Sequence, residues 1–240
     1  MAKTKLRLAD LARADDPRNV PAYSISEAAH YLSISPGTLR AWAAGTKHRS
    51  RAGTRRSARP VLQLPTATAL LLSFFNLVEA HMLRSLRSVH GLDLQRLRVA
   101  LENVGQRLGC ERPLIHESLK TSGVPLLLES LGGIVQAADA PSVQRELTVH
   151  LARIEWEEGW AARLYPLTRH NAADAPHSIV IDPRFAFGRP ILRVSRVPTA
   201  VIASRYKGGE SIDDLTADYG CTRLEIEEAV RCELALKAAA

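Results

Sequence analysis

Cysteine is scarce in this 240-residue chain, and its placement excludes several kinds of site. The three cysteines are Cys110, Cys221 and Cys232, and no two of them form a C-x-x-C pair. An odd number of widely spaced cysteines does not build a disulfide framework, and a structural zinc site needs about four close ligands. The sequence therefore predicts reduced thiols and no bound metal.

Long apolar stretches are also missing. The most apolar one, at 67–83, is interrupted by Asn76, Glu79 and His81, so it is too short and too polar to span a bilayer. The first residues, MAKTKLRLADLARADD, carry acids and lack the apolar centre of a secretory signal. We therefore expect no membrane contact and a cytoplasmic location.

The motifs of common enzymes are absent as well. The sequence contains no G-x-S-x-G, no P-loop and no G-x-G-x-x-G. Its eight histidines are dispersed without the H-E-x-x-H spacing of a metalloprotease. The sequence thus predicts a protein that is not an enzyme and uses no cofactor.

Positive charge is present, and its excess is confined to one end of the chain. Residues 1–60 hold 12 Lys and Arg against 4 Asp and Glu, whereas residues 61–240 hold 20 against 21. A local basic region beside a near-neutral body is typical of a protein that binds a polyanion. Charge alone leaves open the alternative of a solvated basic loop.

The segment SISEAAHYLSISPGTLRAW, at 24–42, predicts two short helices joined by a turn. Ser24 and Glu27 match a capping box, which starts a first helix at 26–32. Ser35 and Pro36 match the start of a second helix, and Gly45 ends it. The residues expected to pack between the two helices are Ile25, Ala28, Ala29, Leu32, Leu39 and Trp42.

This spacing is typical of a helix-turn-helix, in which the second helix presents polar side chains to a major groove. A basic arm, KHRSRAGTRRSAR, follows at 47–59, contains no acid and has Gly53 where a hairpin would turn. Lys and Arg that reach phosphates give affinity with little sequence choice. A surface ion pair is the alternative role for Arg40. The predicted DNA-binding residues are Ser35, Thr38, Arg40, Lys47, Arg49, Arg51, Arg55 and Arg56.

The middle of the chain is predicted to be mainly helical. A short strand is expected at 61–64, then helices at 66–90 and 93–108 that form core or a seam between two copies. Short apolar runs broken by glycine predict a small meander of strands at 112–138, and a helix returns at 141–151. The predicted fold class is therefore mainly α with a small β content (α+β).

The C-terminal part is predicted to be a compact trihelical unit. A short strand-turn segment at 178–199 precedes helices at 199–207, 211–219 and 222–236, with Gly208, Gly209 and Gly220 as stops. Nine basic and nine acidic residues follow position 174. Because this surface is neutral and its last helix is acidic, we interpret the unit as a protein-contact or dimer module.

Two resemblances are carried by these motifs. The N-terminal stretch resembles the MerR-type winged helix-turn-helix at Ile25, Glu27, Ala29, Leu32, Ser35, Thr38, Leu39, Arg40 and Trp42, although its wing is longer and richer in arginine. The stretch IDPRFAFGRPIL from Ile181, followed by SRVP from Ser195, resembles a small bacterial domain of unassigned activity that is often encoded beside PIN-domain toxins. In its usual G-T-R-I-P turn, Val194 replaces the glycine here.

The pairing of both parts is similar to a long VapB-type antitoxin. This resemblance implies a dimeric protein that neutralises a PIN-domain ribonuclease and binds operator DNA to repress its own operon. The toxin's acidic metal cleft would accept a basic side chain, for which the candidates are Arg184, Arg189, Arg193 and Arg196. Pairing of these arginines with Asp182, Asp213 or Asp214 is the alternative. A MerR-like ligand-responsive regulator, with an effector pocket at 110–170, is the alternative function.

The expected organisation follows from these segments. Residues 1–20 form a flexible lead-in, and residues 21–109 form the winged helix-turn-helix with its following helices. Residues 110–170 form a small α/β connecting region, residues 171–178 a linker and residues 179–240 the C-terminal trihelical domain.

Overall fold

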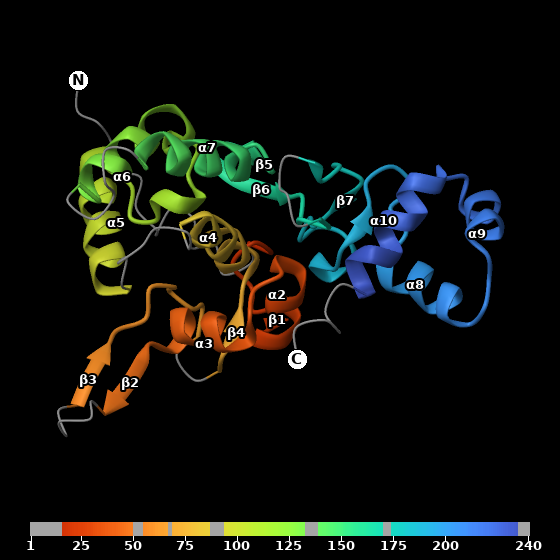
Figure 1. Cartoon of the computed structure of the whole chain (residues 1–240), viewed down its shortest axis with the longest axis horizontal. Helices are drawn as coiled ribbons and strands as arrows, with labels where there is room; N and C mark the ends of the chain where they lie inside the picture. Colours follow the sequence, from red (N-terminus) through yellow and green to blue (C-terminus); the bar gives the residue numbers. More distant parts are fainter. Residues whose placement is uncertain are drawn as a thin grey trace.

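A computed structural model of the chain describes residues 16–49, 55–66, 69–86, 94–132, 139–169 and 174–234, with only the backbone described at 47–49 and 55–58. Within these ranges the chain is mainly helical, with four two-stranded antiparallel sheets. The predicted fold class, mainly α with a small β content, is confirmed. Figure 1 shows the hairpin of β2 and β3 at one end of the molecule, the helix-turn-helix between it and the centre, and the C-terminal helices at the other end.

The helix-turn-helix forms as the sequence predicts. Helix α2 (Ile25–Leu32) starts with a capping box between Ser24 and Glu27. Helix α3 (Pro36–Ala44) has Ser35 as its N-cap and Gly45 as its C-cap. The predicted packing residues of both helices are buried: Ile25, Ala28, Ala29, Leu32, Leu39 and Trp42.

The helix predicted at 66–90 is shorter in the structure, so its start was wrong. Strand β4 (Leu71–Leu72) pairs with β1 (Tyr23–Ser24), and helix α4 (Phe74–Ser85) begins only after the capping residue Ser73. Pairing with a strand about fifty residues earlier in the chain overrides the local helix preference. Every residue of α4 except Arg84 is buried, so this helix is core and cannot be a seam between copies. Residues 87–90 of the predicted helix lie outside the described residues.

The strand predicted at 61–64 is also wrong, because this segment bends instead of pairing. The backbone amides of Val61 and Leu62 both donate to the carbonyl of Trp42, at 2.9 and 3.0 Å. The segment therefore caps the C-terminal end of α3, and its two amides donate to α3 and not to a neighbouring strand.

The strands predicted at 112–138 are replaced by helical turns within the described part, 112–132. Helix α5 (Leu94–Leu108) follows the prediction for 93–108 closely. After it come a 3-10 turn (Pro113–Ile115), a π-helical turn (Leu119–Gly123) and helix α6 (Val124–Ser130). A Cβ at Gly123 would lie 2.9 Å from a methyl of Leu119, so this glycine serves close helical packing and does not mark a break between strands.

The strands of the middle region lie further along the chain. Helix α7 (Ala140–Leu151), which begins within one residue of the predicted 141, leads into the hairpin of β5 (Ile154–Glu157) and β6 (Trp160–Leu164). Its turn residues Glu158 and Gly159 have φ of 53° and 81°, which matches the favoured two-residue hairpin turn.

The C-terminal unit has the predicted elements. Strands β7 (Ile179–Val180) and β8 (Ile191–Leu192) pair before three helices, which are α8 (Thr199–Lys207), α9 (Ile212–Tyr219) and α10 (Arg223–Leu234). Leu164 of β6 exchanges backbone hydrogen bonds with Ile181, at 3.0 and 2.8 Å. This bridge joins the hairpin of the middle region to the C-terminal unit.

Two buried histidines meet where α4 packs on α7. The ring centroids of His81 and His150 are 4.8 Å apart. The ring of His81 donates from Nε2 to the carbonyl of His150, and that of His150 donates from Nδ1 to the carbonyl of Glu146. Burial lowers the pKa of both histidines, that of His81 far below its ordinary value, and the positive charges of Arg84 and Arg153 act in the same direction.

This pair predicts a loss of stability in mild acid. Unfolded imidazoles bind a proton near pH 6.5, whereas the folded pair stays neutral, so the free energy of unfolding should fall as pH drops below that value. Each histidine adds a slope of about 1.4 kcal/mol per pH unit until its folded pKa is reached. Urea unfolding between pH 7.5 and 5 measures this slope, and His150→Gln should reduce it. An unchanged slope in that variant would contradict the assignment.

Candidate nucleic-acid interface

The second helix of the pair, α3, presents its polar face to solvent. Ser35 Oγ accepts from the amide of Thr38 at 3.1 Å, and the two hydroxyl oxygens lie 2.8 Å apart. These two side chains therefore fix the first turn of the helix. Arg40 is exposed and forms no ion pair with any residue that the structure describes, so the described contacts do not support the alternative of a surface ion pair.

The basic arm forms the predicted hairpin directly after α3. Strand β2 (Thr46–Arg49) runs antiparallel to β3 (Arg55–Ala58), with Arg49 opposite Arg55 and His48 opposite Arg56. Lys47 also lies on β2, whereas the predicted tip, with Arg51 and Gly53, lies outside the described residues. Figure 1 shows this hairpin projecting from the body beside α3, so the basic segment lies next to the helix that carries Arg40.

Contacts from α4 and β4 hold the helix pair in place. Arg84 of α4 donates to the carbonyl of Leu32 at 2.6 Å, which satisfies the C-terminal end of α2. The amide of Ala22 donates to the carbonyl of Leu72 at 2.9 Å and extends the β1–β4 pairing. These contacts fix α2 and the strand before it, against which α3 packs, and Arg40 remains exposed.

The C-terminal unit contacts α2 directly. The hydroxyl of Tyr23 donates to the carbonyl of Gly188 at 2.9 Å, and Arg189 pairs with Glu27 at 2.5 Å. Burial tends to raise the pKa of Glu27, but hydrogen bonds from Ser24 and the charge of Arg189 outweigh it and lower the pKa. The carboxylate that caps α2 is therefore also the anchor for a loop of the C-terminal unit.

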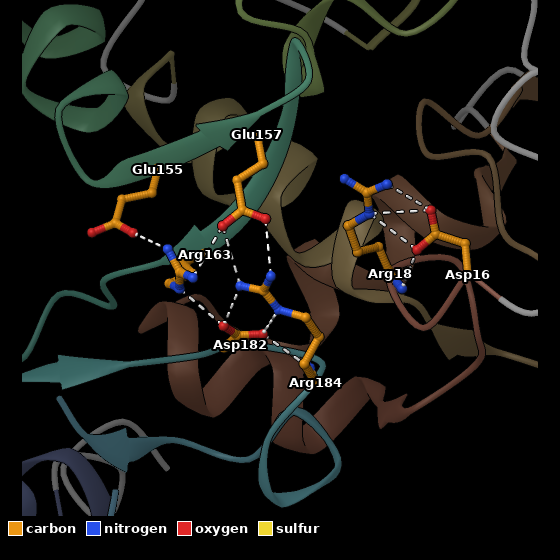
Figure 2. Close-up of polar contacts among 7 residues, drawn as sticks. All are labelled: Asp16, Arg18, Glu155, Glu157, Arg163, Asp182 and Arg184. Carbon is orange, nitrogen blue, oxygen red and sulfur yellow. Dashed lines mark hydrogen bonds and ion pairs between the residues drawn. The ribbon is translucent and has the colours of Figure 1, made fainter. Parts of the chain in front are cut away.

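Two of the four predicted partner-binding arginines are paired within the chain. Figure 2 shows Arg184 between Asp182 and Glu157, at 2.8 and 2.9 Å, with Arg163 on the other side of the same carboxylates. Asp182 is buried, and although burial tends to raise its pKa, hydrogen bonds from Arg184 lower it. Arg189 pairs with Glu27. The predicted internal pairing with Asp182 is thus seen for Arg184, while Asp213 pairs with Arg223 instead.

The other two, Arg193 and Arg196, are exposed and lie over aromatic rings. The guanidinium carbon of Arg196 is 4.2 Å from the ring centre of Phe185, and that of Arg193 is 5.9 Å from the ring centre of Tyr165. Neither arginine forms an ion pair with a carboxylate in the described ranges. The structure therefore separates the four candidates into two that are neutralised and two that are available.

Sequence reasoning missed two buried charged side chains that join the parts of the chain. Arg153 donates to four backbone carbonyls, and Glu228 of α10 pairs with Arg169 at 2.7 Å and accepts from Thr168. Burial lowers the pKa of Arg153 to about 10, which leaves it charged at neutral pH. Glu228 was interpreted as part of an acidic surface, but it is fully buried. No local pattern distinguishes such residues from solvated ones.

The described residues show no sign of a metal site or a membrane span. They contain no group of three His, Cys, Asp or Glu that could hold a metal ion. No described helix is both long and apolar enough to cross a bilayer. All three cysteines are buried and free.

Comparison with known proteins supports two distinct regions. Residues 21–101 match the family described as "Putative DNA-binding HTH domain", and residues 179–231 match the family described as "Protein of unknown function (DUF433)". The first range contains α2, α3 and the basic hairpin. The second contains β7, β8 and most of the trihelical unit.

Similarity to individual proteins extends over most of the chain. A protein named "Putative antitoxin VapB45" from Mycobacterium tuberculosis is 26% identical over 229 residues, which are 88% of this chain and 93% of that protein. "Uncharacterized protein Rv2308" from the same organism is 25% identical over 219 residues, 87% of this chain and 88% of that protein. The crystal structure of Rv2018 from Mycobacterium tuberculosis has a TM-score of 0.64 at 24% identity and covers 88% of this chain and 98% of its own. The chain therefore shares its overall fold with Rv2018 and joins a helix-turn-helix region to a DUF433 region.

Proposed function

We propose that this chain is an antitoxin that binds operator DNA and represses its own operon. The observation that carries the DNA-binding role is the placement of exposed Arg40 on α3 beside a hairpin rich in lysine and arginine. Arg40 and Thr38 contact bases or phosphates from the major groove, and Ser35 orients the first turn. Lys47, Arg49, Arg51, Arg55 and Arg56 bind the phosphate backbone from the hairpin.

The second part of the proposal is the neutralisation of a PIN-domain ribonuclease. Its support is the 26% identity to a protein whose name is "Putative antitoxin VapB45", together with the neutral C-terminal unit that carries arginines on its surface. An arginine that enters the acidic cleft of a metal-dependent ribonuclease would block its active site. Arg193 and Arg196 suit this role better than Arg184 and Arg189, because the latter two are paired internally.

We further propose that the antitoxin acts on DNA as a dimer in the cytoplasm, because helix-turn-helix proteins commonly read two half-sites. Helix α4 is enclosed within one copy, so a seam between copies would use the outer face of α5, where Val99 is exposed. The domain organisation expected from the sequence, with its linker at 171–178, remains part of this proposal.

The alternative is a ligand-responsive regulator of the MerR kind, with an effector pocket at 110–170. A cavity of about 120 Å³ lies between the segment at 60–63, α5 and the turn at 111–114. Pockets for small ligands usually enclose roughly 300–1,000 Å³. An effector bound in this cavity would therefore have to be very small or to open it further. A larger cavity, of about 490 Å³, lies among α8, α9 and α10, outside residues 110–170.

The test is fluorescence anisotropy on a fragment of the chain's own promoter and on a scrambled duplex, across a salt series. We expect Arg40→Ala to lose about 1–3 kcal/mol of binding free energy on the promoter and to discriminate less between the two duplexes. The pair Arg55→Ala and Arg56→Ala should weaken both duplexes equally and make the salt slope shallower by about 2.

The matched control is Arg145→Ala, which removes an exposed arginine from α7, far along the chain from the hairpin. It should leave affinity and salt slope unchanged. Equal and weak binding of the unmodified protein to both duplexes would contradict the DNA-binding role, and the hairpin would then be a solvated loop.

A further inference from the structure

Two loops of the C-terminal unit carry side chains that are exposed to solvent. They are the loop at 183–189 and the loop at 193–197, and they meet where Arg196 lies over the ring of Phe185. We call the residues Phe185, Phe187, Arg193, Val194 and Arg196 the Phe187–Arg196 surface. It lies outside α8, α9 and α10, and Phe187 is in a 3-10 turn at Ala186–Gly188.

The apolar side chains of this surface are unusually open to solvent. Phe187 is 93% exposed and Val194 is 77% exposed, whereas the next most exposed large apolar residues among those described reach only 46%. A phenylalanine held in water contributes nothing to the fold, although burying an aromatic ring is among the largest gains available to an interface. None of the residues that the structure describes covers Phe187, so its ring offers contact area to another molecule.

The backbone that carries Phe187 is strained. Ala186 and Phe187 have φ of 47° and 54°, and Arg196 in the neighbouring loop has φ of 58°. Residues with a side chain adopt this left-handed region only at a cost, which surrounding contacts must hold in place. Such strain gathers at sites of function, because it presents a side chain that a relaxed loop would not.

The contacts that hold this loop are present on its C-terminal side. Gly188 receives a hydrogen bond from the Tyr23 hydroxyl, and a Cβ at Gly188 would lie only 2.3 Å from that oxygen. The next residue, Arg189, is anchored to Glu27 at 2.5 Å. On the other side, Asp182 is buried between Arg163 and Arg184, as Figure 2 shows. The loop is therefore fixed at both ends, and Phe187 stands out from a rigid base.

The charge of the surface indicates the kind of partner. Arg193 and Arg196 form no close ion pair with a carboxylate among the described residues, although the charge of Arg193 helps to lower the pKa of Glu155, while the cations at both ends of the loop, Arg184 and Arg189, are paired. Stacking on Tyr165 and Phe185 orients the two free guanidinium groups without neutralising them. A complementary surface would present carboxylates beside an apolar recess, and arginine with an aromatic residue is the composition of many binding hot spots.

We propose that the Phe187–Arg196 surface is the centre of a protein-binding site, in which Phe187 enters an apolar recess of the partner and Arg196 pairs with carboxylates at its rim. This inference rests on the proposed function, in which the partner is the ribonuclease. It assigns the strongest contact to Phe187, which could not be selected on charge alone.

The experiment measures binding by titration calorimetry between the full chain and the purified protein encoded by the reading frame beside its own gene. Phe187→Gly should weaken binding at least thirtyfold and, because glycine relieves the left-handed backbone, raise Tm by about 2–4 °C. Arg196→Ala should weaken binding at least tenfold and reduce its dependence on salt. Leu224→Ser, at another exposed apolar residue, and Arg145→Ala are the matched controls and should bind as the unmodified chain does.

The outcomes separate the inference from the proposed function. If the unmodified chain binds this protein and both variants bind equally well, the surface is not the site, although the proposed function stands. If the unmodified chain does not bind it at all, the assigned partner is wrong and the inference falls with it. A dimer that dissociates on Phe187→Gly, or promoter affinity that falls with it while partner binding is unchanged, would assign the surface to a second copy or to DNA and overturn the proposal.

Discussion

Arg153→Ala is expected to lower the free energy of unfolding by about 3–5 kcal/mol, which for many domains is most of the stability available. Arg153 is 2% exposed, and its guanidinium donates to the carbonyls of Tyr165, Pro166, Ala175 and Pro176, at 2.5–3.0 Å. Its removal would leave these acceptors without their donor in a buried place, which costs more than the bonds themselves contributed. The four carbonyls lie on either side of 170–173, so this one side chain ties the middle region to the C-terminal unit.

Arg153→Lys separates geometry from charge. Lysine keeps the positive charge but cannot donate in the planar fork that reaches four carbonyls, so we expect about half of the loss to remain. Arg145→Ala, on the exposed side of α7, should change stability by less than about 0.5 kcal/mol. Urea unfolding followed by circular dichroism measures all three variants. A loss below about 1 kcal/mol in Arg153→Ala would show that the guanidinium does not hold this junction.

The helix-turn-helix could be predicted from the sequence because its signals are local. The capping box of Ser24 and Glu27 closes over three residues, and Ser35 and Gly45 start and stop α3 by their own hydrogen bonds and backbone preferences. The hairpin follows the same logic, since its strands are joined by a short glycine-containing connection. At such places the residues that decide the structure are neighbours in the chain.

The errors of prediction occur where distant residues decide. The pairing of Leu71 and Leu72 with a strand at 23–24 cannot be read from the apolar run around them, which looks like a continuing helix. The apolar runs at 112–132 fit either a meander or helical turns by length, and the close approach of Gly123 to Leu108 of α5, fifteen residues earlier, favours the helical form. In both cases a contact with a residue distant in the sequence overrides the local pattern.

The same limit applies to the candidate sites. The sequence identifies Arg40 and the basic hairpin as candidates, because a short segment rich in basic residues can be recognised without knowledge of the fold. It does not show that Arg189 is anchored by Glu27, 162 residues earlier, or that Arg153 is buried. Nor does it show the left-handed backbone of Phe187, since nothing in the letters F-A-F-G distinguishes a projecting ring from a packed one.

The second large effect is expected at the buried ion pair between Glu79 of α4 and Arg112. The guanidinium donates to both carboxylate oxygens, at 2.8 and 2.7 Å, and both side chains are buried. Glu79→Ala or Arg112→Ala alone should lower the free energy of unfolding by about 3–5 kcal/mol, because each leaves an uncompensated buried charge. The double variant Glu79→Leu with Arg112→Met removes both charges and should lose far less than either single change.

This comparison also tests how the hairpin is attached to the core. Asn76 donates to Glu79 at 3.0 Å and to the carbonyl of Gln63 at 2.8 Å, so the ion pair orients the side chain that holds the segment after the hairpin. That segment includes Val61 and Leu62, whose amides bond to Trp42 at the end of α3. Hydrogen exchange at these two amides should therefore accelerate in Glu79→Ala. We expect the acceleration to correspond at least to the lost free energy of unfolding. Acceleration confined to α4 would show that the pair stabilises the core alone and that the hairpin is positioned independently of it.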